Sequence, residues 1–192
     1  MIVLEEIVVV KGCVMKTSFK VSLCGVIGAL SLVLMLLTFV VPFGTFAFPA
    51  FAGMLLVCVV IERGFSWAFL VYFSVSVLSV FLLGDKEAVL YYVAFLGIYP
   101  IIKDLIEKMK SKFLQYLVKF IVFNLCMILC FYVSIFVLSI PKESFELFGV
   151  YVPWMFLILG NIAFVLYDFC VTRIVTIYIL KLHKLLAKNT KL

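Results

Sequence analysis

The feature that most constrains this chain is an apolar segment held between two groups of charged residues. The segment Ala88 to Ile102 carries no charge and is interrupted only by Gly97 and Pro100. The mixed triplet Asp85-Lys86-Glu87 precedes it, and the net positive segment 103–112 follows it. An apolar stretch with one basic end is typical of a membrane crossing whose basic end lies in the cytoplasm.

The composition extends this interpretation to the whole chain. Hydrophobic residues make up 67% of the 192 positions and charged residues 14%, whereas soluble domains average about 45–50% and about 25%. The apolar runs are continuous and do not alternate with polar residues, which is unlike the pattern of a transmembrane β-barrel. We therefore predict an all-α polytopic membrane protein.

The apolar runs divide into six expected transmembrane helices. Two prolines and Gly44 interrupt the pattern over Pro42 to Pro49 without any charge, and we expect a hairpin at the outer face there. The second span is short and could begin nearer Phe46. The expected spans are Val21–Val41, Ala50–Ile61, Phe65–Leu83, Ala88–Ile102, Phe113–Leu138 and Trp154–Leu180.

The distribution of basic residues orients these spans. With six crossings and both termini inside, the inner segments hold twelve Lys and Arg residues, and the outer segments hold only Lys86 and Lys142. Such an excess predicts cytoplasmic amino and carboxyl termini in a plasma-membrane protein. The same distribution explains the net charge of +6 without any nucleic-acid partner.

The domain boundaries follow from this topology. We expect a cytoplasmic segment over 1–17, one membrane domain over 18–185 and a basic tail over 186–192. Residues 1–14 contain Glu5-Glu6 and a short apolar run, which does not fit a signal peptide. Met15-Lys16-Thr17 is more typical of a bacterial start, so we expect translation to begin at Met15, which intact-mass measurement of the native product would test.

Charged and asparagine side chains are few inside the spans: Lys119, Asn124, Asn161, Asp168 and Arg173. A charge at mid-membrane costs about 2.5–3.5 kcal/mol on insertion scales, so Asp168 should face protein or water. Asp168 could form a structural bond with Asn124 or Lys119. Alternatively, Asp168 could be a substrate contact or a proton site. Lys119 and Arg173 lie toward the inner ends, from which they can also snorkel to the interface.

Motifs that carry enzyme chemistry are missing from the sequence. There is no zinc-binding His-Glu-x-x-His, no Gly-x-Ser-x-Gly elbow and no nucleotide-binding glycine loop. The single histidine, His183, lies in the basic tail, and the six cysteines, among them Cys126 and Cys130, are expected to be packing residues. We therefore expect no enzyme activity, metal or cofactor.

The chain resembles the substrate-binding S components of bacterial energy-coupling factor transporters. The resemblance covers most of residues 18–185 and rests on the size, the six spans, the inward termini, the break at Pro42–Pro49 and the small pair Gly25 and Ala29. S components carry an Ala-x-x-x-Ala pattern on their first helix that docks on a transmembrane coupling subunit, and here Gly stands in place of the first Ala.

This resemblance implies uptake of a vitamin-like micronutrient, driven by two cytoplasmic ATPases through the coupling subunit. The ligand would bind near the outer face, under the loop after the first span. The residues expected to contact it are Lys86, Glu87, Tyr92, Tyr151, Trp154 and Asn161. Two alternatives remain: a structural protein such as the small six-span member of the cell-shape complex, and a solitary ion-coupled permease that uses Asp168.

Overall fold

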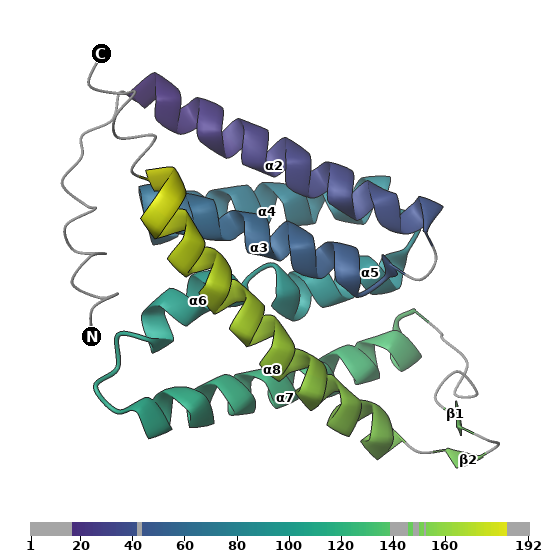
Figure 1. The fold of residues 1–192 in the computed structure, drawn as a ribbon. Helices are drawn as coiled ribbons and strands as arrows, with labels where there is room; N and C mark the ends of the chain where they lie inside the picture. Colours follow the sequence, from purple (N-terminus) through teal and green to yellow (C-terminus); the bar gives the residue numbers. More distant parts are fainter. Residues whose placement is uncertain (1–16, 42–43, 139–145, 148–149, 152, 184–192) are drawn as a thin grey trace.

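The fold was analysed in a computed structural model, which describes residues 17–41, 44–138, 146–147, 150–151 and 153–183. The chain is predominantly helical in this part, as predicted (Figure 1). A short antiparallel pairing joins β1 to β2, with Glu146 opposite Tyr151. The elements are α2 Thr17–Val40, α3 Ala47–Arg63, α4 Phe65–Leu82, α5 Lys86–Tyr91, η2 Tyr92–Leu96, α6 Tyr99–Ile106, α7 Lys112–Phe136, β1 Glu146–Leu147, β2 Val150–Tyr151, α8 Pro153–Ile177 and η4 Tyr178–His183.

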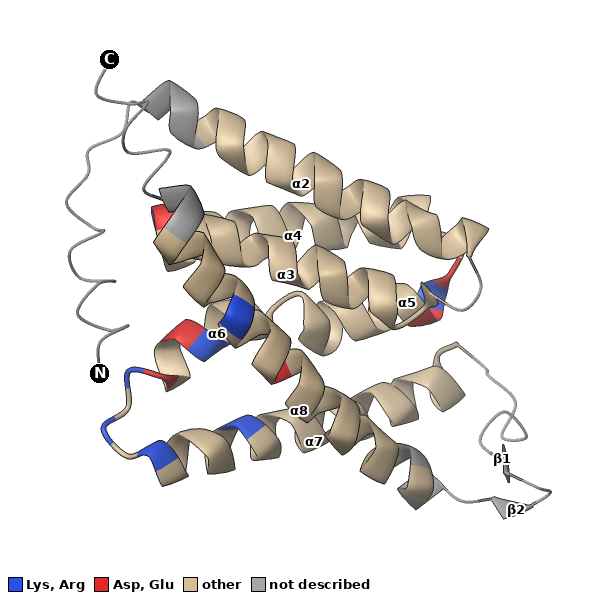
Figure 2. Cartoon of the chain, in the orientation of Figure 1, with Lys and Arg blue, Asp and Glu red and all other residues tan. Residues whose placement is uncertain are grey.

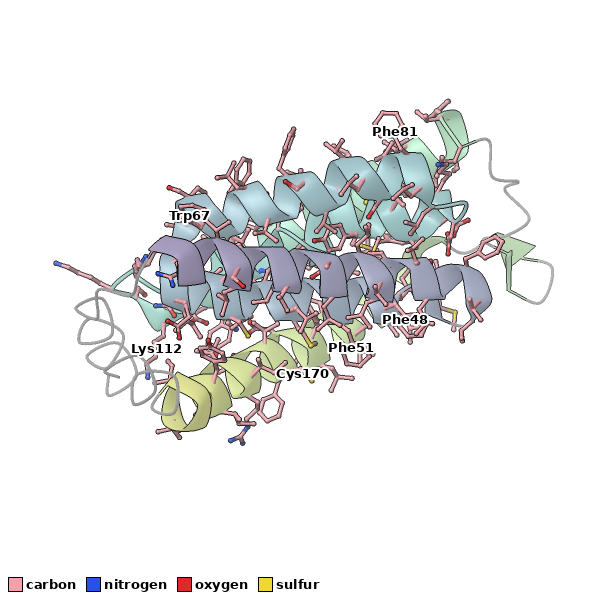
Figure 3. All side chains as sticks on the ribbon, turned by 90° about the horizontal axis from the view of Figure 1, so that it is seen from above. Phe48, Phe51, Trp67, Phe81, Lys112 and Cys170 are labelled. Carbon is pink, nitrogen blue, oxygen red and sulfur yellow. The ribbon has the colours of Figure 1, made fainter. Side chains whose placement is uncertain are left out.

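Five helical segments in the described residues are long and apolar enough to cross a membrane. Most of their ends agree within a few residues with the spans expected from sequence. The segments are Val21–Val40, Phe65–Leu82, Lys86–Ile106, Lys112–Phe136 and Leu157–Leu180. Large apolar side chains cover their outer surfaces, and Phe81, at the end of α4, is 81% exposed and points away from the other helices (Figure 3).

Helix α3 is the shortest of the expected crossings and the one at the centre of the bundle. It has 17 residues and packs against α2, α4, α6 and α8. It begins at Ala47, near the Phe46 start that the sequence allowed, with Pro49 in its first turn, where proline is tolerated. It ends at Arg63, because Gly64 has a φ of +80° that favours glycine. The span expected from the sequence closes two residues earlier, at Ile61.

The fourth expected crossing, over 88–102, is a broken helix in the structure and not one continuous span. The α-helix α5 passes into the π-helix η2, and α6 begins only after Gly97 and Ile98. A break at membrane depth leaves carbonyl groups that need partners inside the protein. The hydroxyl of Tyr72 donates to the Val93 carbonyl at 2.6 Å, and the hydroxyl of Tyr167 donates to the Leu96 carbonyl at 2.8 Å.

The turn before α5 is held together by Asp85, the first residue of the charged triplet that the sequence singled out. Asp85 accepts a hydrogen bond from the Ala88 amide at 3.0 Å, which caps α5. It also accepts from the Thr45 hydroxyl at 3.1 Å and so ties the turn before α3 to the start of α5. The charged triplet is therefore part of the frame at this end of the bundle.

The close packing of α3 on the broken helix depends on Gly53. A Cβ atom at this position would lie 2.1 Å from the Leu96 carbonyl oxygen and 2.9 Å from the Tyr167 hydroxyl. Backbone cannot move away as a flexible side chain can. We predict that Gly53→Ala lowers the free energy of unfolding by about 1–3 kcal/mol, the usual range for overpacking. Thermal unfolding of the purified chain in detergent would measure this loss.

Gly25→Ala is the matched control for this prediction. A Cβ atom at Gly25 meets nothing within 4 Å, and alanine is the better helix former by about 0.8–1.0 kcal/mol. We expect this variant to unfold at or slightly above the wild-type temperature. Equal effects of the two substitutions would contradict the account of the α3 contact.

Candidate functional site

Charged and polar side chains from α6, α7 and α8 meet inside this otherwise apolar protein. Figure 2 shows the charged residues gathered where α6 ends and α7 begins, with a second group at the start of α5. At the first of these places, Lys103 and Glu107 at the end of α6, Lys119 of α7 and Asp168 of α8 contact one another. We call these four residues the charge cluster.

Lys103 is the most completely bonded member of the charge cluster. Its Nζ atom donates to the Asp168 carboxylate, and to the Thr172 hydroxyl at 2.7 Å. It also lies 3.2 Å from the Asp168 backbone carbonyl and 3.2 Å from Oε1 of Glu107. The side chain is 4% exposed. These contacts join α6 to α8.

Lys119 brings α7 into the same cluster. Its Nζ atom lies 2.9 Å from Oε1 of Glu107, and 3.2 and 3.3 Å from the two carboxylate oxygens of Asp168. The ring of Tyr116 lies 5.7 Å from the ammonium, within cation–π range. The sequence left open whether Lys119 snorkels to the interface or pairs with Asp168, and the structure shows the pair.

Tyr99 is a further hydrogen-bond partner of the Asp168 carboxylate. Its hydroxyl donates to Oδ1 at 2.5 Å. The ring is 1% exposed and packs edge-on against Phe164 of α8 at 5.4 Å between centroids. Tyr99, Lys103 and Glu107 are spaced by four residues, which puts the three side chains on one face of the α6 turn.

The charge cluster is balanced. It contains two ammonium groups and two carboxylates, and both lysine side chains are at least 95% buried. A buried ion is tolerated only when paired and hydrogen-bonded, because desolvation is otherwise too costly. The cluster can therefore hold three helices in one register, and each of its charges depends on the others.

Asn124 and Asn161 form a separate polar contact between α7 and α8. Each side-chain amide donates to the carbonyl oxygen of the other, at 3.1 and 3.0 Å. Each amide nitrogen also donates to the backbone carbonyl four residues earlier in its own helix. The suggestion that Asn124 pairs with Asp168 is therefore wrong, because Asn161 occupies that amide.

The residues expected to contact a ligand lie in different surroundings. The Nζ atom of Lys86 donates to the carbonyls of Val80 and Leu83, both at 2.8 Å, and so caps the end of α4. Glu87 is half-buried in the first turn of α5, whereas Tyr92 is fully buried among the helices. The side chains of Tyr151 and Trp154 lie outside the described part of the chain. A ligand-binding role for these residues and for Asn161 stays a prediction.

The small residues of the first helix point away from the rest of the protein. Gly25 and Ala29 are exposed, and Ser22 is exposed beside them. A Cβ atom at Gly28, by contrast, would contact Val71 of α4 at 3.5 Å. The α2 helix therefore has one small residue packed inside the bundle and a separate exposed strip, which we define as Ser22, Gly25 and Ala29.

Arg173 lies on the outer side of α8. Its side chain is exposed, and the guanidinium carbon lies 4.9 Å from the centroid of the Phe169 ring. It takes no part in the charge cluster, although it is only five residues from Asp168.

In the described part of the chain, Cys126 and Cys130 are free thiols, and no three His, Cys, Asp or Glu side chains gather as metal ligands would.

Two grooves on the described surface are apolar. The first, of about 280 Å³, lies between α2, α3 and α8, where Phe51 points in Figure 3. The second, of about 410 Å³, lies between α4 and the broken helix. Both suit hydrocarbon chains better than a polar ligand. Their walls are formed by Leu34, Phe51, Met54, Leu55, Cys58 and Ile174, and by Phe69, Tyr72, Phe73, Ser76, Val77, Val80, Val93 and Ile98.

The sequence identifies Asp168 and its Lys119 partner but not Lys103 and Glu107, the other half of the cluster. It places Lys103 in the net positive segment that follows the fourth expected span, whereas in the structure Lys103 lies on α6 and is 3% exposed. The signal for it was present in the four-residue spacing of Tyr99, Lys103 and Glu107. Pro100 and the surrounding charges concealed that spacing, because they favoured a helix end at Ile102.

Removal of one charge should disturb the cluster more than removal of an opposite pair. Asp168→Asn leaves two buried ammonium groups against Glu107 alone, and we predict a loss of about 3–5 kcal/mol of unfolding free energy. Combining it with Lys103→Gln removes one charge of each sign and should recover part of that loss. Chemical denaturation in mixed micelles would compare these variants.

Asp104→Asn supplies the control for this comparison. Asp104 pairs with Lys108, which is 49% exposed, and exposed pairs contribute only about 0–1 kcal/mol. The cluster would not be a stabilising unit if Asp104→Asn destabilised the chain as much as Asp168→Asn.

Comparisons of the chain with protein-family models, with curated proteins and with solved structures found no match.

Proposed function

We propose that this chain is the membrane-embedded substrate-binding subunit of an uptake system for a small, vitamin-like molecule. Partner ATPases and a transmembrane coupling subunit would supply the energy and the docking surface. The observation that carries the proposal is the exposed strip Ser22, Gly25 and Ala29 on α2. Small residues let a second helix approach closely within the bilayer.

The strip is available to a partner because the described part of the bundle does not pack on it. No described residue comes within 4 Å of a Cβ atom added at Gly25, although Gly28, three residues on, packs against α4. A glycine in an exposed helix position lowers helix stability by about 1 kcal/mol relative to alanine. A docked helix of the coupling subunit would compensate for that loss.

The proposal includes six crossings with both termini in the cytoplasm. Helix α3, with 17 residues, extends roughly 25 Å at 1.5 Å per residue and would be the sixth. The assignment of α3 as a crossing is supported by the position of this helix between longer helices, which run from one end of the bundle to the other (Figure 1). The start of α2 and the end of η4 lie at the same end as the α6–α7 turn.

A ligand at the outer end would approach the turn formed by Thr45, Asp85, Lys86 and Glu87. Asp85 and Lys86 already bond the protein itself, so Glu87 is the charged side chain of this turn that we assign to the ligand. Tyr92 and Asn161 would contribute only after a movement of the helices around them.

The docking role predicts a separation between complex formation and stability. Ala29→Leu should abolish co-purification with a coupling subunit, because its side chain fills the strip. The isolated variant should keep the wild-type unfolding temperature, since Ala29 is exposed. Co-purification and thermal unfolding of the same preparations would measure both properties.

Two matched variants on α2 complete this experiment. Gly28→Leu enlarges a residue that faces Val71 and should lower the unfolding temperature. Val40→Leu enlarges a residue that is 71% exposed at the other end of α2, away from the strip, and should change neither property. The docking role is contradicted if Ala29→Leu unfolds the chain, or if the complex survives it unchanged.

The proposed orientation predicts which turns can be labelled from outside the cell. In a background without native cysteines, Lys142→Cys should react with an impermeant maleimide added to intact cells. Lys108→Cys, in the turn after α6, should react only after the membrane is opened. The reverse pattern would overturn the orientation.

A further inference from the structure

Glu107 differs from the other members of the charge cluster in its exposure. Its side chain is 39% exposed, whereas those of Lys103 and Lys119 are 4% and 5% exposed. Its Oε1 atom nevertheless contacts both ammonium groups, at 3.2 and 2.9 Å. One half-exposed carboxylate thus covers two buried cations at the edge of the bundle.

We propose that Lys103 and Lys119 form a binding site for a small oxyanion, a carboxylate or a phosphate, which Glu107 fills in this structure. When the Glu107 side chain turns outward, the anion takes its place between the two ammonium groups. In the proposed orientation the site faces the cytoplasm, opposite the outer turn assigned to the transported ligand. The site does not depend on the coupling subunit.

The charges of the cluster explain why an anion is needed. Without Glu107, two buried ammonium groups face only the Asp168 carboxylate, and one positive charge is uncompensated. Lys103 keeps its bonds to Asp168 and Thr172, but Lys119 loses its shortest contact. An oxyanion restores the missing negative charge and accepts hydrogen bonds from both lysines. Such hydrogen bonds are strong because donor and acceptor are both ionised.

The position of Glu107 allows this exchange. It is the first residue after α6 and lies in the turn before α7. The turn is fixed through its backbone, because Nε2 of Gln115 donates to the carbonyls of Glu107 at 3.1 Å and Met109 at 2.7 Å. The Glu107 side chain can therefore rotate outward while the turn stays in place.

Chemical rescue of Glu107→Ala tests the site directly. The full-length variant is purified in detergent with acetate present, and its unfolding temperature is measured after exchange into acetate, phosphate or chloride at equal ionic strength. We expect a lowered temperature in chloride and a saturable recovery in acetate, phosphate or both. Comparison of acetate with phosphate shows which oxyanion the site prefers.

Two controls separate binding from a general salt effect. Asp104→Ala removes a carboxylate from α6 that contacts Lys108 outside the cluster, and its unfolding temperature should change with the anion only as much as that of the wild type. The double variant Glu107→Ala/Lys119→Gln lacks one of the two ammonium groups and should lose the rescue. The proposal is overturned if rescue is absent, or if both controls respond like Glu107→Ala.

A second variant decides the question if Glu107→Ala cannot be purified. Glu107→Gln keeps the size of the side chain and removes the negative charge that contacts the two ammonium groups. Its unfolding temperature should rise in acetate or phosphate, relative to chloride, by more than that of the wild type. An equal response of Glu107→Gln and the wild type to these anions would overturn the proposal.

Discussion

The structure depends on the electrostatic balance of four charged side chains in a medium that hardly screens charge. In water two unit charges 4 Å apart interact by about 1 kcal/mol, and the interaction grows several-fold as the effective dielectric constant falls. The four charges of the cluster lie close together and pair with opposite sign, across α6, α7 and α8. They are Lys103, Lys119, Glu107 and Asp168. Helices α7 and α8 are thereby tied to the broken helical segment Lys86–Ile106 at one end.

The broken helical segment brings a second requirement, because backbone carbonyls at a break within a membrane need hydrogen-bond partners inside the protein. Tyr72 of α4 and Tyr167 of α8 donate to two of these carbonyls, and Gly53 lets α3 approach the second one. Tyr167 and Asp168 are neighbours on α8, so one turn of that helix serves both the break and the charge cluster. The position of α6, which carries Lys103, is therefore fixed from both sides.

The sequence predicts the helices well and their contacts poorly, for a physical reason. Hydrophobic runs, Gly64 and the prolines determine where helices begin and end, and these are local properties. The contact of Lys103 with Asp168 joins residues 65 positions apart, and no local pattern requires it. Asp168 could be recognised from its cost in the membrane, and Lys119 from its position in a span, but Lys103 was concealed by its charged neighbours.

The cluster also bears on the choice between a partner-driven subunit and a solitary ion-coupled permease. A coupling carboxylate must gain and lose a proton or an ion during transport, so it must be able to change its partners. Asp168 accepts bonds from Tyr99, Lys103 and Lys119 in one arrangement, and protonation would leave both lysines facing Glu107 alone. Such a carboxylate is better suited to fixing helices than to cycling.

Glu107, which is half exposed, is the member of the cluster whose contacts can change without dismantling it. Energy for movement would then come from outside the chain, and the exposed strip on α2 is a surface through which a partner could supply it.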